Sequence, residues 1–181
     1  MKRPAFLFLA LLLAASTVEL HAQHTVILVR HAEKASDPPR DPELTEEGTA
    51  RAIELADLLE HMDIDHIISS QFTRTKRTVE PLAARRGLEI EIVGAGTSPE
   101  ALQAVVSAVA ARPDGETIVV AGHSNTVPRL VGALGGPALD DLQDHEYDSI
   151  YVMNRSRDGD ATMMRLRFGA PNKPAPATEG H

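Results

Sequence analysis

Two histidines and two arginines stand shortly after apolar runs in this sequence, and these residue types could bind and attack a phosphoryl group: Arg30, His31, Arg74 and His123. The apolar runs cover residues 25–29 and 117–121, and Arg74 follows a third predicted strand at 64–69. Arginine offers a planar, permanently charged fork to phosphate oxygens. A neutral histidine can act as a nucleophile. The four residues therefore predict a cationic, phosphate-sized site that contains its own nucleophile.

Each of these residues has a task in phosphoryl transfer. The reaction needs positive charge around three equatorial oxygens and a nucleophile in line with the leaving group. Arg30 and Arg74 could supply the charge, and a neighbouring arginine helps to keep His31 neutral, so that its lone pair can attack phosphorus. His123, if protonated, would donate a hydrogen bond to the developing negative charge. The set could thus perform phosphoryl transfer with His31 attacking.

The apolar runs themselves predict buried strands. Residues 25–29 and 117–121 are apolar and rich in β-branched side chains, which is typical of strands covered on both faces of a parallel sheet. Open α/β sheets bind their ligands at the carboxyl ends of the strands. We therefore expect the candidate residues to meet at one edge of a sheet.

Strands and helices are predicted to alternate along the chain. Thr45 and Ser98 are expected N-cap residues, Gly87 is expected to end the second helix, and Pro81 should kink or restart that helix. The predicted strands are 25–29, 64–69, 88–93, 117–122, 149–154 and 161–168, and the predicted helices are 46–61, 73–86, 99–111 and one that ends near 134. The last two strands flank an Asp158-Gly159 turn. This order predicts an α/β fold with a mostly parallel sheet between helical layers.

Both ends of the sequence are predicted to lie outside the folded domain. Residues 1–22 have a cationic start, a short apolar stretch and a small final residue, which is typical of a cleavable secretory signal. An uncleaved anchor is the alternative. We expect a single domain at 23–169 and a disordered tail, rich in Pro and Ala, at 170–181. The mature protein is expected in the periplasm or outside the cell.

Composition and charge disfavour several kinds of partner. The chain carries a net charge of −8 at pH 7, which argues against nucleic acid and anionic membranes. Tryptophan is absent and aromatic residues make up 3% of the chain, so stacking on bases is not expected. The remaining histidines are scattered without zinc-ligand spacing, and cysteine is absent. We expect a small phosphorylated substrate, no metal and no cofactor, whereas nothing indicates the oligomeric state.

Four motifs give the sequence its resemblance to a known family: Arg30-His31-Ala32-Glu33, Leu44-Thr45-Glu46-Glu47-Gly48, Ser69-Ser70 with Arg74-Thr75, and Gly122-His123-Ser124. Their order and spacing resemble the histidine phosphatase superfamily (phosphoglycerate mutase-like) from the first strand to about Phe168. The resemblance implies a three-layer α/β/α sandwich whose six-stranded sheet has the order 3-2-4-1-5-6, with the fifth strand antiparallel.

The resemblance also implies a role for each site residue. His31 would become phosphohistidine, and Arg30 and Arg74 would clamp the phosphate. His123 would be the second histidine of the pocket, with Ser124 beside it as a further substrate-binding residue. The chain is most similar in pattern to compact members of the superfamily that resemble phosphohistidine phosphatases and small-substrate phosphatases.

Two departures from the family pattern concern the group that protonates the leaving group. Residues 93–97 lack the glutamate-bearing insertion of the mutase-like branch, and Ser124 stands where the phytase-like branch has aspartate. Either the leaving group departs without a proton, or another carboxylate supplies it. The candidates are Glu33 first and Glu80 second, followed by Asp37 and Glu100.

Three other functions stay open beside this one. The segment 122–126 lies between a strand and a helix, like a nucleophile elbow, so Ser124 could act in a serine hydrolase with an aspartate of 140–144 and His145. Thr126 replaces the second elbow glycine, however, and Arg30-His31 is left unexplained. A phosphate-binding protein without activity would use the same pocket, and a mutase would need an acid–base group that is lacking here. The preferred hypothesis is an exported, metal-independent phosphatase for a small phosphoester or phosphoramidate.

Overall fold

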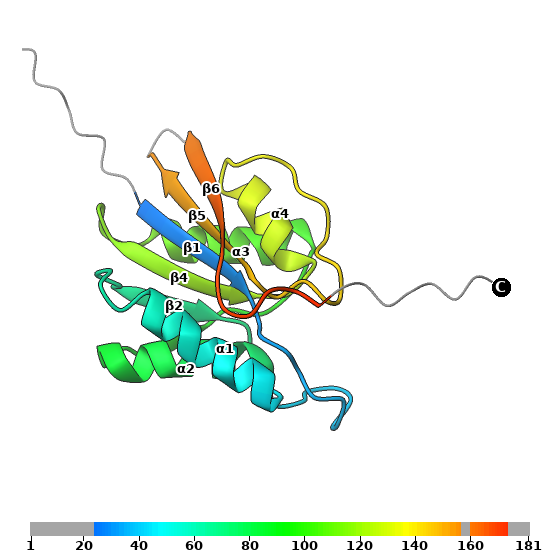
Figure 1. The fold of residues 1–181 in the computed structure, drawn as a ribbon. Coiled ribbons are helices and arrows are strands. Elements are labelled where there is room, and N and C mark those ends of the chain that lie inside the picture. The colour runs from blue at the N-terminus through cyan, green and yellow to red at the C-terminus, as the bar shows by residue number, and fades with distance from the viewer. Residues whose placement is uncertain (1–23, 157–159, 174–181) are drawn as a thin grey trace, which may run out of the picture.

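A six-stranded sheet with helices on both faces forms the core of the chain in the computed structural model, which describes residues 24–156 and 160–173 (Figure 1). The strands are β1 (His24–Arg30), β2 (His66–Ser69), β3 (Ile90–Ile92), β4 (Thr117–Gly122), β5 (Ser149–Arg155) and β6 (Ala161–Arg167). The helices are α1 (Glu46–Leu58), α2 (Thr73–Arg86), α3 (Pro99–Ala110) and α4 (Thr126–Ala133). The predicted signal peptide and the Asp158-Gly159 turn lie outside the described residues.

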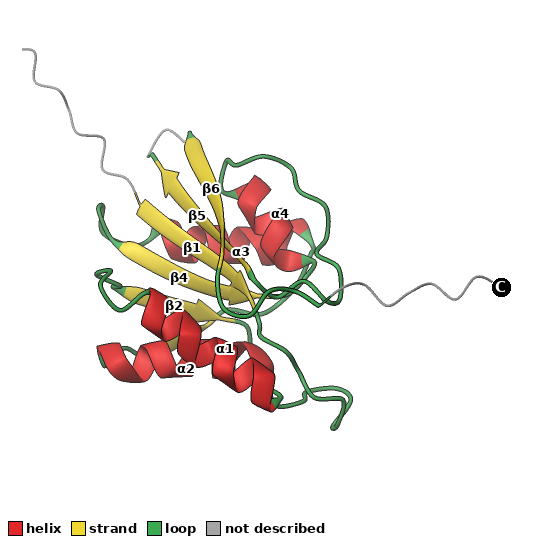
Figure 2. Ribbon diagram, viewed as in Figure 1, coloured by secondary structure: helices red, strands yellow, loops and turns green. Residues whose placement is uncertain are grey.

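The sheet has the strand order β3-β2-β4-β1-β5-β6. Strands β3, β2, β4 and β1 run parallel to one another, whereas β5 is antiparallel to both of its neighbours, β1 and β6. Figure 2 shows α1 and α2 on one face of the sheet and α3 and α4 on the other. The expected α/β/α sandwich, the strand order and the antiparallel fifth strand are thus confirmed, and the sheet is mixed.

The continuous apolar run of β1 reflects burial on both faces. Val26 and Leu28 pack in the core beneath α3 and α4, whereas Ile27 and Val29 pack in the core beneath α1 and α2. All four side chains are fully buried, and each contributes about 1.5–3 kcal/mol by leaving water. The strand that precedes Arg30 and His31 is therefore firmly fixed.

Most predicted boundaries agree with the structure, and the differences have local causes. Strand β2 begins at His66 rather than at 64 because the Asp65 carboxylate accepts the Thr117 N–H at 2.8 Å, a donor that a longer ladder would use. Helix α2 runs without a break through Pro81, so the helix does not restart there. Gly87 ends it with φ of 64°, the left-handed conformation expected of a C-terminal glycine.

Residues 170–173, the start of the predicted tail, lie against the domain. The Asn172 side-chain oxygen accepts from the backbone N–H of Tyr147 and Asp148, and its nitrogen donates to the Asp148 carboxylate at 2.8 Å. Residues 174–181 lie outside the described residues. Among those described, no helix has the length and apolar character needed to cross a membrane.

Candidate active site

Strand register brings the two histidines together. Arg30, the last residue of β1, pairs with Gly122, the last residue of β4, so His31 and His123 leave the sheet side by side. Their ring centroids lie 5.4 Å apart. Ser70 follows the end of β2, the other neighbour of β4. The prediction that these residues meet at the carboxyl edge of the sheet is correct.

A cavity of about 620 Å³ opens at this edge. Five of the predicted site residues line it: Arg30, His31, Arg74, His123 and Ser124. Its walls include parts of the segments 94–97 and 135–146, which follow β3 and α4. The open side of this cavity is therefore formed by loops, while its floor is formed by strand ends.

His31 is held as a neutral base. Its Nδ1–H donates to the Ala32 carbonyl oxygen at 2.8 Å, and because a carbonyl can only accept, the lone pair is on Nε2. Burial, aided by the charges of Arg30 and Arg74, lowers the pKa of His31 from 6.5 to about 3. At neutral pH the ring therefore carries no charge and has a free lone pair on Nε2.

The Arg30 guanidinium is held by contacts through Nη1 and the Tyr147 ring, whereas its Nε–H has no partner among the described residues. Its Nη1 donates to the carbonyls of Gln143 and Glu146 at 2.6 and 2.8 Å, and its Cζ lies 4.1 Å from the centroid of the Tyr147 ring. Its buried Nε has no hydrogen-bond partner among the described residues. A buried N–H without a partner is costly, so this edge of the guanidinium is suited to an oxyanion.

The Arg74 guanidinium is likewise held by contacts within the protein and has a donor without a partner in the described part of the chain. Its Cζ lies 4.4 Å from the Phe72 ring centroid, and its Nη2 is 3.4 Å from His123 Nδ1. Its buried Nε also lacks a partner among the described residues. Two guanidinium groups thus present unsatisfied donors near the His31 ring, an arrangement that favours a bound phosphate or a similar anion.

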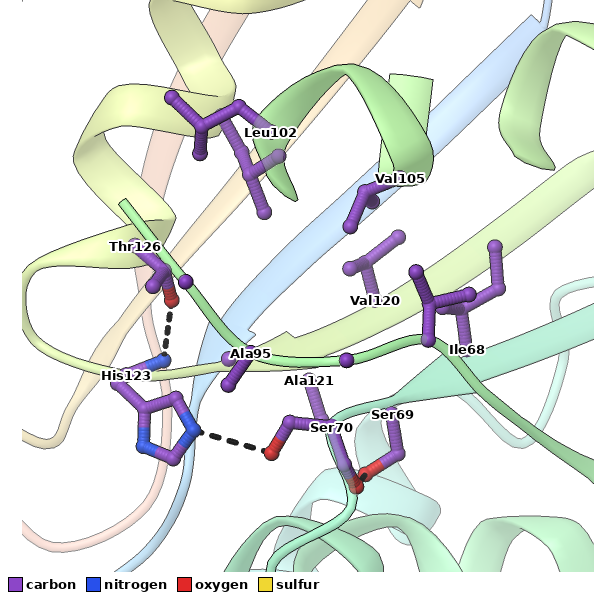
Figure 3. Close-up of a pocket in the computed structure, with 15 residues that line it drawn as sticks. Ile68, Ser69, Ser70, Ala95, Leu102, Val105, Val120, Ala121, His123 and Thr126 are labelled. Carbon is purple, nitrogen blue, oxygen red and sulfur yellow. Dashed lines mark hydrogen bonds between the residues drawn. The ribbon is translucent and has the colours of Figure 1, made fainter. Parts of the chain in front are cut away.

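A chain of hydrogen bonds sets the tautomer of His123. Thr75 Oγ1 donates to the Phe72 carbonyl at 2.7 Å, so it accepts from Ser70 Oγ at 2.6 Å. Ser70 Oγ in turn accepts from His123 Nε2–H at 3.0 Å, the bond that Figure 3 shows. The Nδ1 lone pair of His123 therefore faces Arg74. Burial, with the charges of Arg74 and Arg30, lowers the pKa of His123 from 6.5 to about 4. The ring is neutral at pH 7 in the free protein, and a bound phosphate would favour its protonation.

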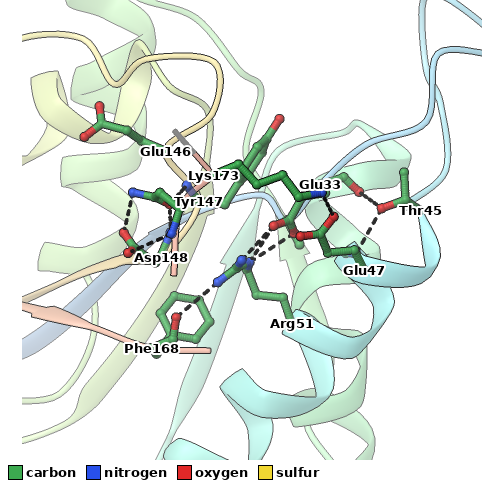
Figure 4. Close-up of polar contacts among 12 residues, drawn as sticks. Glu33, Thr45, Glu47, Arg51, Glu146, Tyr147, Asp148, Phe168 and Lys173 are labelled. Carbon is green, nitrogen blue, oxygen red and sulfur yellow. Dashed lines mark hydrogen bonds and ion pairs between the residues drawn. The ribbon is translucent and has the colours of Figure 1, made fainter. Parts of the chain in front are cut away.

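Glu33 does not lie in this cavity. Its two oxygens accept from Arg51 Nε at 3.0 Å, and Arg51 Nη2 lies 2.7 Å from Glu33 Oε1 (Figure 4). The Arg51 side chain is only 2% exposed and also donates to the Phe168 carbonyl. The Glu33 backbone packs against Gly48, where a Cβ would lie 2.2 Å from its carbonyl oxygen. Glu33 is therefore an anchor between the nucleophile loop and α1, and the structure does not support it as the proton donor.

The other predicted acids also lie elsewhere. Glu80 forms an ion pair with Arg77 on the surface of α2, Glu100 is in the first turn of α3, and neither these residues nor Asp37 line the cavity. Ser124 lines it, but His145 lines a different cavity beside Glu33. The arrangement expected for a serine hydrolase is thus not supported.

Sequence reasoning missed three residues of the site. Ser70 and Thr75 belong to a motif that was recognised, but their hydrogen bonds to His123 could not be seen in it. Tyr147, which stacks on Arg30, follows a segment with no regular periodicity. Only Ser70 has a local signal, a hydroxyl directly after a strand, whereas Thr75 lies within α2 and Tyr147 lies just before β5.

One contact joins the first loop to Arg74. Helix α2 has no side-chain N-cap of its own. Instead, the Asp41 carboxylate accepts from Thr73 N and Oγ1, both at 2.7 Å, and lies 3.8 Å from Arg74 Nη1. Asp41 therefore caps the helix that carries Arg74, although it lies on the loop after β1.

We expect Asp41→Ala to lower the free energy of unfolding by about 1 kcal/mol, the usual cost of a lost N-cap, and Asp41→Asn to cost less. The hydrogen bonds from Thr73 lower the pKa of Asp41 from its ordinary 3.8. The charged cap therefore contributes fully above that pH and is lost as the pH falls through the lowered value. Urea unfolding at pH 7 and pH 3 measures both effects. Equal losses for Ala and Asn at pH 7 would contradict the assignment.

Comparisons with known proteins agree with this geometry. The sequence profile of the histidine phosphatase superfamily (branch 1) matches residues 26–95. A protein of Shigella dysenteriae named as a probable phosphoglycerate mutase, GpmB, is 39% identical over 71 residues, which are 36% of this chain. The match spans 33%, about a third, of that relative's length.

Solved structures share the fold. The protein histidine phosphatase SixA complexed with tungstate has a TM-score of 0.65 at 20% identity, over 79% of this chain and 96% of that one. A candidate phosphohistidine phosphatase SixA from Agrobacterium tumefaciens has a TM-score of 0.59 at 23% identity, over 82% and 98%.

The fold and the site together define an α/β sandwich protein with a histidine pair and two arginines at the carboxyl edge of its sheet. Residues 26–95 match the histidine phosphatase superfamily in sequence, and the chain shares its fold with solved histidine phosphatases.

Proposed function

We propose that this protein is a phosphatase that hydrolyses a small phosphoester or phosphoramidate through phosphohistidine on His31. One observation carries the proposal: a neutral His31 lines the same cavity as two arginines whose buried Nε–H groups lack partners among the described residues. A neutral imidazole with a free Nε2 lone pair is a competent nucleophile for phosphorus.

The proposed reaction has two steps. In the first, His31 Nε2 forms a bond to phosphorus as the bond between phosphorus and the leaving group breaks, while Arg30, Arg74 and protonated His123 bind the equatorial oxygens. In the second, water attacks phosphorus, the N–P bond breaks and inorganic phosphate leaves. The positive charge in both steps comes from side chains, and the proposal includes no metal.

The names of two structural neighbours, both phosphatases for phosphorylated histidine, support a phosphoramidate substrate. The open, loop-lined cavity also gives water access to the phosphohistidine, which supports hydrolysis over transfer to a second substrate. Export to the periplasm or beyond remains part of the proposal, and the composition of residues 1–22 supports it.

Trapping the intermediate tests the proposal. Wild-type protein exposed briefly to an aryl phosphate and quenched in base should gain about 80 Da, the mass of one phosphoryl group, as expected for covalent catalysis. His31→Ala should show neither adduct nor turnover, whereas His61→Ala, which replaces an exposed histidine after α1, should retain both.

Three results would contradict the proposal or part of it. Full turnover by His31→Ala would exclude this nucleophile. Absence of both adduct and turnover in the wild type, together with phosphoester binding that survives His31→Ala, would instead support a binding protein without activity. Loss of activity after EDTA treatment would contradict the metal-independent mechanism.

A further inference from the structure

The phosphate cavity holds two carboxylates that the proposed mechanism does not yet use. Within the described part of the chain, Asp141 and Asp144 are the acidic side chains that line it, and both come from the segment between α4 and β5. This wall lies apart from the β3–α3 connection, where the mutase-like branch carries its glutamate. The cavity therefore has carboxylates from the α4–β5 segment, although the β3–α3 connection supplies none.

The two aspartates differ in their surroundings. Asp141 Oδ2 lies 3.4 Å from Arg129 Nη2 on α4, so its carboxylate is turned toward that helix. Asp144 interacts electrostatically with Arg30 and Tyr147. Asp144 is thus the carboxylate near the guanidinium that would bind phosphate.

The backbone around Asp144 is held in place by the site itself. Arg30 Nη1 donates to the carbonyls of Gln143 and Glu146, which flank Asp144 on both sides. Leu142 N donates to the Ser124 carbonyl at 2.9 Å, which ties the same segment to the loop of His123. The backbone of Asp144 is therefore held in place by Arg30 on one side and by the loop of His123 on the other, although its side chain is exposed.

We propose that Asp144 is the general acid that protonates the leaving group, an inference that rests on the proposed phosphatase function. The substrate binds as its monoanion and passes its one proton to the Asp144 carboxylate, while His123 takes a proton from solvent when the phosphate binds. As His31 Nε2 bonds to phosphorus and the ester P–O bond breaks, the proton passes from Asp144 to the departing oxygen and yields the alcohol. Asp144 then takes a proton from the attacking water, while the N–P bond breaks and phosphate leaves.

Two other proton donors near the cavity compete with this assignment. Lys34 lines the cavity as an exposed ammonium, where it could stabilise the negative charge of a leaving group. The Tyr147 ring stacks on Arg30 and its centroid lies 6.2 Å from that of His31, but this residue lines the second cavity rather than the phosphate cavity. Asp144 lines the cavity and, as a carboxylate, can both give and take a proton, which one catalytic cycle requires.

Leaving-group dependence tests the proposal. The kcat/KM of Asp144→Asn should fall by roughly 100-fold or more with alkyl phosphates, the usual magnitude for a lost general acid, and much less with 4-nitrophenyl phosphate, whose leaving group departs without a proton. Across a series of aryl and alkyl phosphates, log kcat/KM should therefore decline more steeply with leaving-group pKa in Asp144→Asn than in the wild type.

Matched variants keep the result specific. Asp140→Asn changes an exposed aspartate of the same segment that does not line the cavity, and it should behave as wild type. A steeper dependence in Asp141→Asn or Lys34→Met but not in Asp144→Asn would overturn the assignment, as would an equal loss on all substrates. The adduct on His31 should still form in Asp144→Asn from 4-nitrophenyl phosphate, so the inference can fail while the proposed function stands.

Discussion

Replacing Arg30 with alanine is expected to lower kcat/KM for phosphoesters by on the order of 1000-fold, the magnitude found for arginines that stabilise a transferring phosphoryl group. The reason is geometric as well as electrostatic. The guanidinium is locked by two carbonyls and by Tyr147, so it meets the phosphate without rearranging. Steady-state kinetics with an aryl phosphate measure the loss.

Lysine should restore little of the activity at this position. A lysine ammonium cannot bond both carbonyls and also offer a second donor edge, because it lacks the planar fork of arginine. Arg129→Ala, which removes an exposed arginine from α4, serves as the control and should leave kcat/KM unchanged. A loss of less than tenfold for Arg30→Ala would show that the phosphate does not use this guanidinium.

Arg51→Met is expected to lower the free energy of unfolding by about 3–5 kcal/mol, the cost of removing one partner of a buried ion pair. The Glu33 side chain is 13% exposed and would lose its partner. The Phe168 carbonyl would lose a donor as well. Urea unfolding monitored by circular dichroism measures the change.

A second substitution separates the ion pair from packing. In Arg51→Met/Glu33→Leu no carboxylate is left buried, so the double variant should be more stable than Arg51→Met alone. Arg85→Met breaks an exposed ion pair with Asp57 and should cost less than about 1 kcal/mol. If the double variant is no more stable than the single one, the loss comes from packing rather than from an unpaired charge.

The fold and the phosphate-binding half of the site could be predicted from sequence because they depend on short-range patterns. The runs that became β1 and β4 are buried on both faces, and their ends place His31 and His123 at a common edge whatever the loops do. The N-caps at Thr45 and Ser98 and the glycine at 87 are likewise local signals.

The residues proposed to move protons, and those that position the site, could not be predicted because their places depend on contacts between segments that are distant in sequence. Glu33 was favoured for its nearness to His31 in sequence, but its partner Arg51 lies 18 residues away on a helix. Asp41 caps a helix 32 residues further along the chain. Asp144 and Tyr147 lie on an irregular segment whose path is set by Arg30, and no periodicity reveals such a path.

The position of β1 in the sheet has a consequence for the order in which the protein can be made. This strand is synthesised first, yet its two neighbours, β4 and β5, come from residues 117–122 and 149–155. At ordinary rates of translation the ribosome needs on the order of ten seconds to produce that intervening chain. Until β4 has been made, both hydrogen-bonding edges of β1 are unpaired and His31 has no neighbours from β4, and the second edge stays unpaired until β5 follows. The nascent chain therefore cannot carry a working nucleophile until nearly all of it has left the ribosome.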